Sequence, residues 1–314
     1  MLIPLVVIAG PTASGKTALA LDIARELGGE IISADSMQIY KEMNIGTAKP
    51  TAEEMREVPH HMIDIAAPDE NCSLWKFAAR AHDAVKDVYS RGKLPILAGG
   101  TGLYTDTIVQ NLRLSEASND NSVREELMKK AKSGGAAGLY AKLAEIDPDT
   151  ASKLCENDVK RVVRALEIYY LTGKTKSEND EISKKSKKIY NYLYFAIETE
   201  REILYNRINT RVDEMIENGL FEEVAAIKNK YGFIDTTAMQ GIGYREILFY
   251  LRGLTTRAEA AELIKRNTRR LAKRQMTWLR KNDGVIWVKP GDSALCVKLI
   301  REKLLAEDVG KCKK

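Results

Sequence analysis

A glycine-rich octapeptide near the N-terminus restricts the fold of this chain more than any other segment. It follows directly on an apolar run and reads Gly10-Pro11-Thr12-Ala13-Ser14-Gly15-Lys16-Thr17, the spacing of a phosphate-binding loop between a strand and a helix. The glycines let successive N–H groups point inward, Lys16 adds a point charge, and the next helix adds its N-terminal dipole. We therefore expect a bound di- or triphosphate, with Mg2+ held by the Thr17 hydroxyl.

The order of apolar and helical segments predicts an α/β fold. Short apolar or β-rich runs alternate with stretches of helical periodicity, which is typical of a parallel sheet, here of the P-loop NTPase-like kind. The predicted strands are residues 5–9, 31–34, 94–98, 190–197 and 285–288.

Four regions are expected along the chain. They are a P-loop α/β core over residues 1–112, completed by strands near 190–198 and 284–289; a helical insertion over 113–188; a basic helical region over 201–283, packed on the core; and a C-terminal helix and tail over 290–314. Helical spacing runs from Ser122 to Leu171, whereas the lysine-rich segment from Lys174 to Lys188 lacks periodicity and is expected to be a mobile loop. The basic region should break near Gly232 and at residues 240–243.

Composition is that of a globular protein. With 314 residues, 44% of them hydrophobic, the chain can bury a sizeable core, and its apolar runs are too short to span a bilayer. We expect a cytoplasmic monomer without a membrane partner. The four cysteines, Cys72, Cys155, Cys296 and Cys312, form no CxxC pair, so reduced thiols are favoured over a zinc site or a disulfide framework.

Asp35 lies where the second predicted strand ends, and open parallel sheets bind their ligands at this carboxyl edge. It should therefore face the phosphates, where a carboxylate can bind Mg2+ through water, act as a general base or merely cap the next helix. Ser36 and Gln38 could hydrogen-bond the edge of a base, although a turn uses similar residues.

A second glycine-rich turn, Gly99-Gly100-Thr101-Gly102, follows the strand 94–98. It implies close approach of the backbone to a ligand and brings the Thr101 hydroxyl to the edge that carries Asp35, although such a turn could also simply pack a helix on a strand. No acidic residue closes this strand, which weakens a motor-ATPase interpretation. His60 and His61 stand apart from other ligand types, so a structural role is favoured over metal binding.

Arginines occur in two short helical patterns. Arg161 and Arg164 lie close together on a predicted helix, where they either solvate a surface or hold phosphates. Arg207 and Arg211 have an i, i+4 spacing beyond the strand 190–197, so one of them could reach over the phosphates and stabilise a leaving group.

The net charge of +5 is concentrated near the C-terminal end. Residues 265–281 contain no acidic side chain, and Arg266, Arg270 and Arg274 share one helical face. Such runs are often only solvated faces. An acid-free arginine run with an aromatic residue, here Trp278, nevertheless favours contact with nucleic-acid phosphates and bases.

Eight short blocks, spread over nearly the whole chain, form a specific pattern when taken together. They are GPTASGKT (10–17), DSMQIY (35–40), IGTAKP (45–50), HHMID (60–64), GGTGLY (99–104), RVVRALE (161–167), QGIGYRE (240–246) and KRQMTWLR (273–280). In order and spacing they resemble the bacterial tRNA dimethylallyltransferases, the IPP transferase family. The resemblance implies transfer of a dimethylallyl group from its diphosphate to N6 of adenosine 37, beside the tRNA anticodon, with the adenine flipped into a channel whose other mouth admits the donor.

The resemblance also implies roles for individual residues. Residues 12–17 would hold the diphosphate and Mg2+, with no ATP hydrolysed. Asp35 matches the family's general base, Thr101 the partner that positions the reacting groups, and Arg211 the arginine on the departing pyrophosphate.

Further residues match family segments that touch tRNA, which would be the macromolecular partner. They are Asp35, Ser36, Met37, Gln38, Thr101, Lys160, Arg161, Arg164, Gln240, Gly241, Gly243, Tyr244, Arg245, Lys273, Arg274, Gln275, Trp278 and Arg280. One departure is Arg245, which stands where many relatives carry lysine.

Two other functions compete with this interpretation. A P-loop small-molecule kinase would use Lys16 and Thr17 on ATP and Asp35 on an acceptor hydroxyl, but leaves the basic helix unexplained. A nucleotide-gated RNA-binding protein would use the P-loop as a switch, but leaves Asp35 and Thr101 without a task.

Overall fold

The computed structural model describes residues 2–112 and 122–305. Contacts divide the chain into two compact units, and each is described by itself. The first comprises residues 1–72, 78–106 and 189–314, and the second Ser73–Phe77 and Thr107–Lys188. The second unit thus covers the range 113–188 of the predicted insertion and adds residues 107–112 and Ser73–Phe77.

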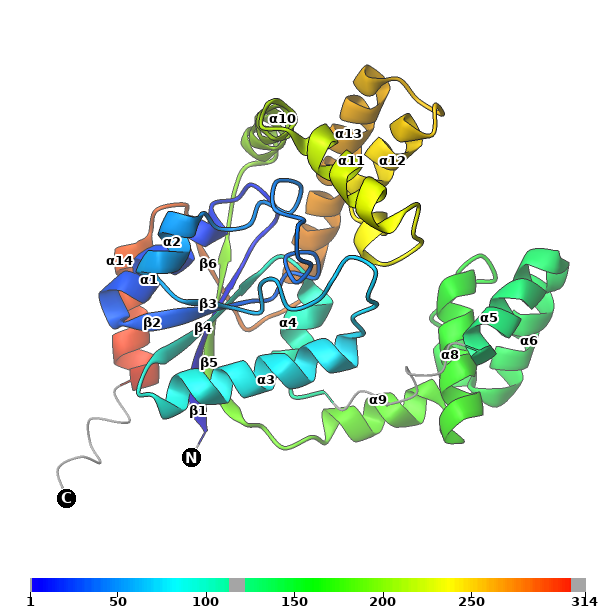
Figure 1. Ribbon diagram of the computed structural model, residues 1–314. Coiled ribbons are helices and arrows are strands. Elements are labelled where there is room, and N and C mark those ends of the chain that lie inside the picture. The colour runs from blue at the N-terminus through cyan, green and yellow to red at the C-terminus, as the bar shows by residue number, and fades with distance from the viewer. Residues whose placement is uncertain (1, 113–121, 306–314) are drawn as a thin grey trace. The chain divides into compact units, whose positions relative to one another are not determined.

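A six-stranded sheet forms the centre of the first unit (Figure 1), and all of its strand pairs are parallel. The strands are β1 (Ile3–Ala9), β2 (Gly29–Ser33), β3 (His60–His61), β4 (Leu94–Gly99), β5 (Tyr190–Ile197) and β6 (Val285–Val288), in the order β3-β2-β4-β1-β5-β6. The predicted α/β fold and all five predicted strands are confirmed. The sixth strand, β3, has two residues, too few to produce a periodic signal.

The register of the sheet determines which loops meet. Ala9, the last residue of β1, is paired with Gly99 of β4, and Ser33 of β2 with Ala98. The P-loop, the segment after β2 and the turn after β4 therefore leave the sheet side by side at its carboxyl edge, where open α/β sheets bind ligands.

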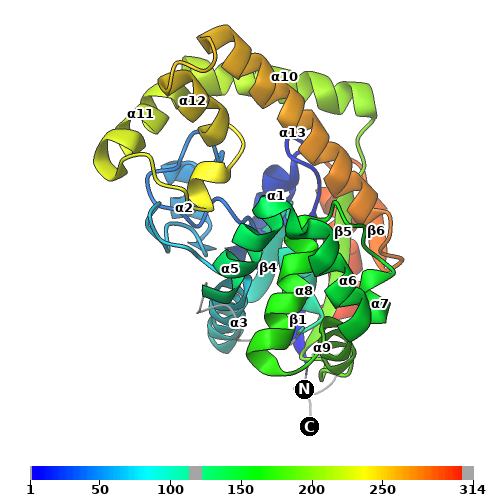
Figure 2. The ribbon, with the colours of Figure 1, turned by 90° about the vertical axis from the view of Figure 1, so that its right-hand side faces the viewer.

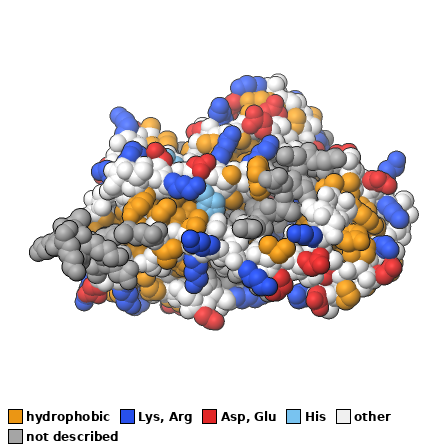
Figure 3. Space-filling view, turned by 90° about the horizontal axis from the view of Figure 1, so that it is seen from below, with side chains coloured by type: hydrophobic (Ala, Val, Ile, Leu, Met, Phe, Trp, Pro, Cys, Tyr) orange, Lys and Arg blue, Asp and Glu red, His pale blue; other side chains and the backbone are white. Residues whose placement is uncertain are grey.

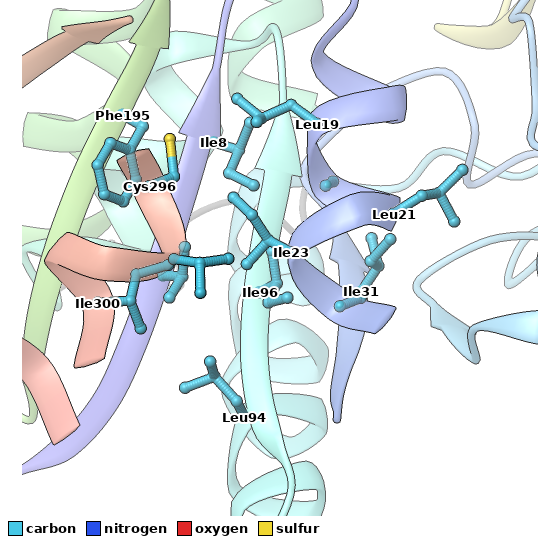
Figure 4. Packing of buried hydrophobic residues seen from close by; sticks show 14 of the residues in the cluster. Ile8, Leu19, Leu21, Ile23, Ile31, Leu94, Ile96, Phe195, Cys296 and Ile300 are labelled. Atoms are coloured by element: carbon cyan, nitrogen blue, oxygen red, sulfur yellow. The ribbon is translucent and has the colours of Figure 1, made fainter. Parts of the chain in front are cut away.

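One face of the sheet is covered by α1 (Lys16–Leu27) and α14 (Ser293–Ile300), and the chain continues from α14 into one further turn, Arg301–Leu305. In Figure 4, Ile23 of α1 lies beside the strand residues Ile8 and Ile96, and Ile300 of α14 belongs to the same cluster; all four are fully buried. Burial of each such side chain contributes about 1.5–3 kcal/mol. This packing fixes α1, and with it the P-loop, against the sheet.

Three further helices belong to this unit in whole or in part. Residues 78–90 of α3 (Leu74–Ser90) join the sheet through His82, whose Nδ1 lies 2.6 Å from the Tyr190 hydroxyl at the start of β5. The helix α4 (Gly102–Val109) starts at the second glycine-rich turn, and α2 (Ala52–Glu57) is capped by Thr51. No helix in the described ranges is long and apolar enough to cross a membrane.

The remaining helices of the first unit are α10 (Arg201–Glu217), α11 (Leu220–Tyr231), α12 (Tyr244–Leu251) and α13 (Arg257–Leu279), with a 3-10 turn at Ala238–Gln240 (Figure 2). Long α13 packs on α10 and α12 and leads into β6. The predicted breaks near Gly232 and at 240–243 are confirmed. Two more breaks, at Gly219 and Gly253, were not predicted; both glycines have positive φ, the usual signal of a helix boundary.

The second unit contains α5 (Ser122–Lys130), a widened turn (Ala131–Gly135), α6 (Ala136–Ile146), α7 (Pro148–Ala151), α8 (Val159–Thr172) and α9 (Lys176–Lys184). Its core includes Leu127, Leu143 and Leu166, so the prediction of helices alone up to Leu171 is confirmed for the described residues. The prediction of a mobile loop over Lys174–Lys188 is wrong, because α9 occupies most of this segment. Thr175 and Glu178 form a reciprocal capping box that starts α9, a local signal that does not require apolar periodicity.

Candidate functional site

A cavity of about 500 Å³ opens at the carboxyl edge of the sheet in the first unit. It is lined by the P-loop, residues 35–38, the loop 46–48, the turn 100–103 and residues 242–243. Side chains from α10, α11 and α13 complete its wall. Lys16, Thr17, Asp35, Thr101 and Arg211, which sequence reasoning selected separately, all line this one cavity.

A larger hollow, of about 770 Å³, lies over α1 and α14 and shares no lining residue with this cavity. Its charged residues pair with one another, since Arg25 lies 3.2 Å from Asp22 and Arg301 lies 2.9 Å from Glu26. Satisfied surface pairs of this kind give it no resemblance to a ligand site.

Local backbone conformation shapes the P-loop. Gly15 has φ +93° at the N-cap of α1, and Ala13 also has positive φ. A Cβ at Gly10 would lie 2.5 Å from the hydroxyl of Ser14, which is buried, so glycine is required there. The Ser14 N–H donates to the Pro11 carbonyl at 3.3 Å and closes the turn of the loop.

Lys16, Asp35 and Arg211 interact electrostatically. Burial lowers the pKa of Lys16 to about 8, Asp35 opposes this shift and Arg211 adds to it. Burial also lowers the pKa of Arg211, again opposed by Asp35. Two partly desolvated cations beside a single carboxylate favour a ligand that brings further negative charge.

Asp35 has one carboxylate oxygen in a local turn, because its Oδ1 accepts the N–H of Met37 at 2.9 Å. This turn leaves Oδ2 for the cavity. The carboxamide of Gln38 is used within the protein: it donates to the carbonyl oxygens of Thr47 and Ala48 and accepts from the Ser33 hydroxyl. Of the two interpretations left open for Gln38, these contacts favour the turn.

The turn after β4 is pressed against α13. The Gln275 side chain donates from Nε2 to the Gly100 carbonyl at 2.9 Å, and its Oε1 accepts the N–H of Thr12 at 3.1 Å. A Cβ at Gly102 would overlap the indole of Trp278. The glycines of this turn thus admit a helix side chain, whereas the sequence led us to expect close approach of a ligand.

Glu223 of α11 holds the loop that follows Met43. Its carboxylate accepts the backbone N–H groups of Asn44, Ile45 and Gly46 at 2.8 to 3.2 Å and the Tyr244 hydroxyl at 2.6 Å. Tyr244 is fully buried, so its side chain supports this loop instead of reaching the surface.

Glu246 organises the segment around Gly243 in a similar way. It is 1% exposed and accepts from the Gly243 N–H, from Arg245 and from Asn267 of α13. Sequence reasoning missed both Glu223 and Glu246. Glu246 lies within the QGIGYRE block and three residues after Gly243, which is the position of a capping glutamate.

The two histidines have structural contacts. His61 Nε2 lies 2.7 Å from Glu30, and His60 Nδ1 lies 2.7 Å from the Val58 carbonyl. Lys49 of the IGTAKP block binds Asp64 of the HHMID block at 2.6 Å. Among the described residues no group of three or more His, Cys, Asp or Glu could hold a metal, and none of the described cysteines is in a disulfide; Cys312 lies outside them.

The basic helix α13 presents Arg266, Arg270 and Arg274 to solvent, and Arg274 also lines the cavity. Lys265, on another side of α13, binds Asp213 of α10 at 2.7 Å and so helps to attach the helix. On the face in Figure 3, by contrast, lysine and arginine side chains are interspersed with acidic and hydrophobic ones.

Within the second unit, Lys160 and Arg161 are exposed on α8, whereas Arg164 has a partner. Its guanidinium and that of Arg124 each lie 2.9 Å from Glu167, whose side chain is fully buried. Arg164 therefore neutralises a buried carboxylate, whatever else it binds.

The class of protein follows from what the cavity can hold. A P-loop on a parallel sheet binds phosphate, the two partly desolvated cations call for a multiply charged ligand, and a wall formed by a basic helix suits a second, polyanionic substrate. These features define a P-loop NTPase-like protein that brings a phosphorylated small molecule to a nucleic acid.

Comparison with known proteins is more specific. The chain matches the IPP transferase family over residues 38–282. It is 49% identical to a tRNA dimethylallyltransferase of Acetivibrio thermocellus, with 94% of each chain covered, and 46% identical to that of Caldanaerobacter subterraneus over the full length of both. The solved tRNA isopentenylpyrophosphate transferase of Bacillus halodurans is 41% identical and superposes with a TM-score of 0.73, with 98% of each chain covered. A eukaryotic dimethylallyltransferase acting on tRNA gives 30% identity and a TM-score of 0.79, covering 98% of this chain and 77% of that one.

The chain belongs to the IPP transferase family, and its activity is transfer of a dimethylallyl group to tRNA. The resemblance and the activity expected from the sequence are confirmed, and the kinase and nucleotide-switch alternatives are not needed.

Proposed function

We propose that the cavity at the carboxyl edge of the sheet transfers a dimethylallyl group from dimethylallyl diphosphate to N6 of adenosine 37, forming i6A and releasing diphosphate. The observation that supports this proposal best is the position of Lys16, Asp35 and Arg211 around one P-loop cavity. The two cations suit a diphosphate, and the carboxylate suits an amino group that must lose a proton.

The P-loop binds the diphosphate of the donor. The backbone N–H groups at the start of α1, from Gly15 to Thr17, point to the phosphates, and the Lys16 ammonium supplies charge. As N6 attacks the allylic carbon, the carbon–oxygen bond to the diphosphate breaks and negative charge grows on the leaving oxygen. Lys16 and Arg211 stabilise that charge, and because both are partly desolvated, their interaction with it is stronger than in water.

Asp35 is the general base. The amino nitrogen of adenine becomes positively charged when it forms the new bond, and it must then give up a proton. Oδ2, the oxygen not used by the local turn, accepts that proton, while the Met37 N–H fixes Oδ1 and so orients the carboxylate. The Thr101 hydroxyl, on the same cavity wall, positions the reacting groups.

Mg2+ fits this donor set. The Thr17 hydroxyl and the Asp35 carboxylate are hard oxygen ligands, and both line the cavity. Thr17 would hold the ion directly and Asp35 through water. When bound, Mg2+ neutralises part of the charge on the diphosphate.

The tRNA anticodon stem-loop binds along α13 and the segments that adjoin the cavity, and adenosine 37 enters flipped out of the stack. Arg274 and Trp278 line the cavity, and Lys273 and Arg280 are exposed beside them, as a phosphate-binding surface requires. In the second unit, Lys160 and Arg161 are exposed on α8 and form a separate tRNA contact. The region 201–283 thus serves as the basic tRNA-binding region.

Two further expectations from the sequence belong to this proposal. The chain acts as a monomer, and it is located in the cytoplasm.

Incubation with Mg2+, radiolabelled dimethylallyl diphosphate and unmodified tRNA tests this assignment, with the label located by nuclease digestion. We expect label on adenosine 37 for the unaltered protein. Asp35→Ala should still bind tRNA but lose at least a hundredfold in transfer rate. The control is Asp83→Asn, because Asp83 is an exposed carboxylate on α3 that pairs with Lys86. Unchanged turnover in Asp35→Ala would remove Asp35 from the mechanism.

A further inference from the structure

Gln275 lies in the helix proposed to bind tRNA, yet its side chain is directed to the donor site. Both polar ends of its carboxamide are used: Oε1 by the N–H of Thr12 in the P-loop and Nε2 by the carbonyl of Gly100 in the turn after β4. These two loops leave neighbouring strands, since Ala9 is paired with Gly99. One side chain of α13 therefore bridges both loops that form the floor of the cavity.

The backbone around this bridge is built to admit it. A Cβ at Gly100 would lie 2.5 Å from Gln275 Nε2 and 3.2 Å from the Gly10 carbonyl oxygen, and the Cβ of any other residue at Gly102 would overlap Trp278. Gln275 and Trp278 are three residues apart and so lie on the same side of α13. Side chains of α13 thus fill the space beside both glycines. The helix cannot shift without moving the turn or breaking these contacts.

The same helix carries the exposed arginines. Arg274 precedes Gln275 directly, and Arg270 and Arg266 follow at intervals of one helical turn toward its N-terminus. If tRNA phosphates bind these arginines and displace α13, the carboxamide of Gln275 moves with the helix. Its two hydrogen bonds then move Thr12 and Gly100.

We propose that Gln275 is a positioning residue that couples tRNA binding on α13 to the geometry of the donor-binding P-loop, and not an RNA contact. The proposal rests on the proposed function, because it takes the donor diphosphate as the occupant of the P-loop. With Gln275 in place, the Thr12 N–H is fixed and the loop is preorganised. By reciprocity, any gain in donor affinity on tRNA binding equals the gain in tRNA affinity on donor binding.

Gln275→Met keeps the length of the side chain and removes both hydrogen bonds. These bonds exist before the donor binds, so only the part of their free energy that preorganises the P-loop contributes to affinity, and we expect about a tenfold rise in the dissociation constant of dimethylallyl diphosphate. The affinity for tRNA alone should change less than about twofold, and saturating tRNA should no longer tighten donor binding. Gly102→Ala, which displaces Trp278 from the other side of the contact, should change the donor constant in the same direction.

The matched control is Gln110→Met, which makes the same substitution at an exposed glutamine just after α4 that does not line the cavity. Thermal unfolding of every variant separates a folding defect from the coupling effect, and the unaltered protein is assayed for transfer to tRNA in parallel.

The outcomes are distinguishable. Weaker donor binding with unchanged tRNA binding and lost coupling supports the proposal. Weaker tRNA binding with unchanged donor binding overturns it and makes Gln275 the tRNA contact expected from the sequence. Unchanged constants for both ligands overturn it as well. Failure of the unaltered protein to bind the donor at all would instead contradict the proposed function.

Discussion

Donor binding should weaken as the pH rises above 8, because Lys16 starts from a lowered pKa. Burial lowers that pKa to about 8, so at higher pH the ammonium of the ligand-free protein is increasingly neutral. A diphosphate favours the charged form and raises the pKa again, so binding at alkaline pH must take up a proton. The dissociation constant then rises by roughly twofold at pH 8 and roughly tenfold at pH 9 relative to neutral pH, since one pKa unit corresponds to a tenfold change.

Calorimetric titration with dimethylallyl diphosphate from pH 7.5 to 9.5 measures this dependence, and two buffers with different ionisation enthalpies give the number of protons taken up. Lys16→Arg is the control, because its guanidinium stays charged over this range and its affinity should not follow the same slope. A constant affinity between pH 8 and 9.5, or binding without proton uptake, would refute the reasoning for Lys16.

Three substitutions test other parts of the structure. Arg211→Met should lower kcat by about a hundredfold, because it removes a cation from the leaving group; single-turnover transfer measures this, and an unchanged rate would leave Arg211 without a catalytic role. Glu223→Ala should lower the free energy of unfolding by about 3 kcal/mol, because three backbone N–H groups and the Tyr244 hydroxyl lose their acceptor, whereas Glu223→Gln should cost less; urea denaturation compares the two, and equal losses would contradict the hydrogen-bond argument. Ile23→Ala should cost about 2–5 kcal/mol in the same assay, because it opens a cavity among fully buried residues between α1 and the sheet, and a loss below 1 kcal/mol would show that the site collapses around the gap.

Sequence patterns predicted the sheet because its strands are continuous apolar runs bounded by turn residues. They did not predict α9, whose segment has a single apolar residue, Ile182, within Lys176–Lys184 and is identified instead by the capping pair Thr175 and Glu178. Nor could they predict β3, whose two residues form a strand only because β2 lies beside them.

For the candidate site, local spacing found the P-loop, and position at the edge of the sheet found Asp35 and Thr101. Spacing offered Arg207 and Arg211 as a pair, and only the resemblance chose Arg211 between them, because its place over the P-loop depends on how α10 packs on the sheet. The partners of Gln275 lie far away in the sequence, at Thr12 and Gly100, and no periodicity records such pairs.

The order of the strands has a consequence for synthesis of the chain. Along its whole length β1 pairs with β5, from Ile3 with Tyr190 to Ala9 with Ala196, and the long continuous part of the second unit, Thr107–Lys188, lies between them in sequence. On the ribosome, that helical part can fold while β1 still has an open edge. The P-loop thus emerges before the second unit but is among the last segments to acquire its final surroundings, because Arg211 and Gln275 follow only after β5.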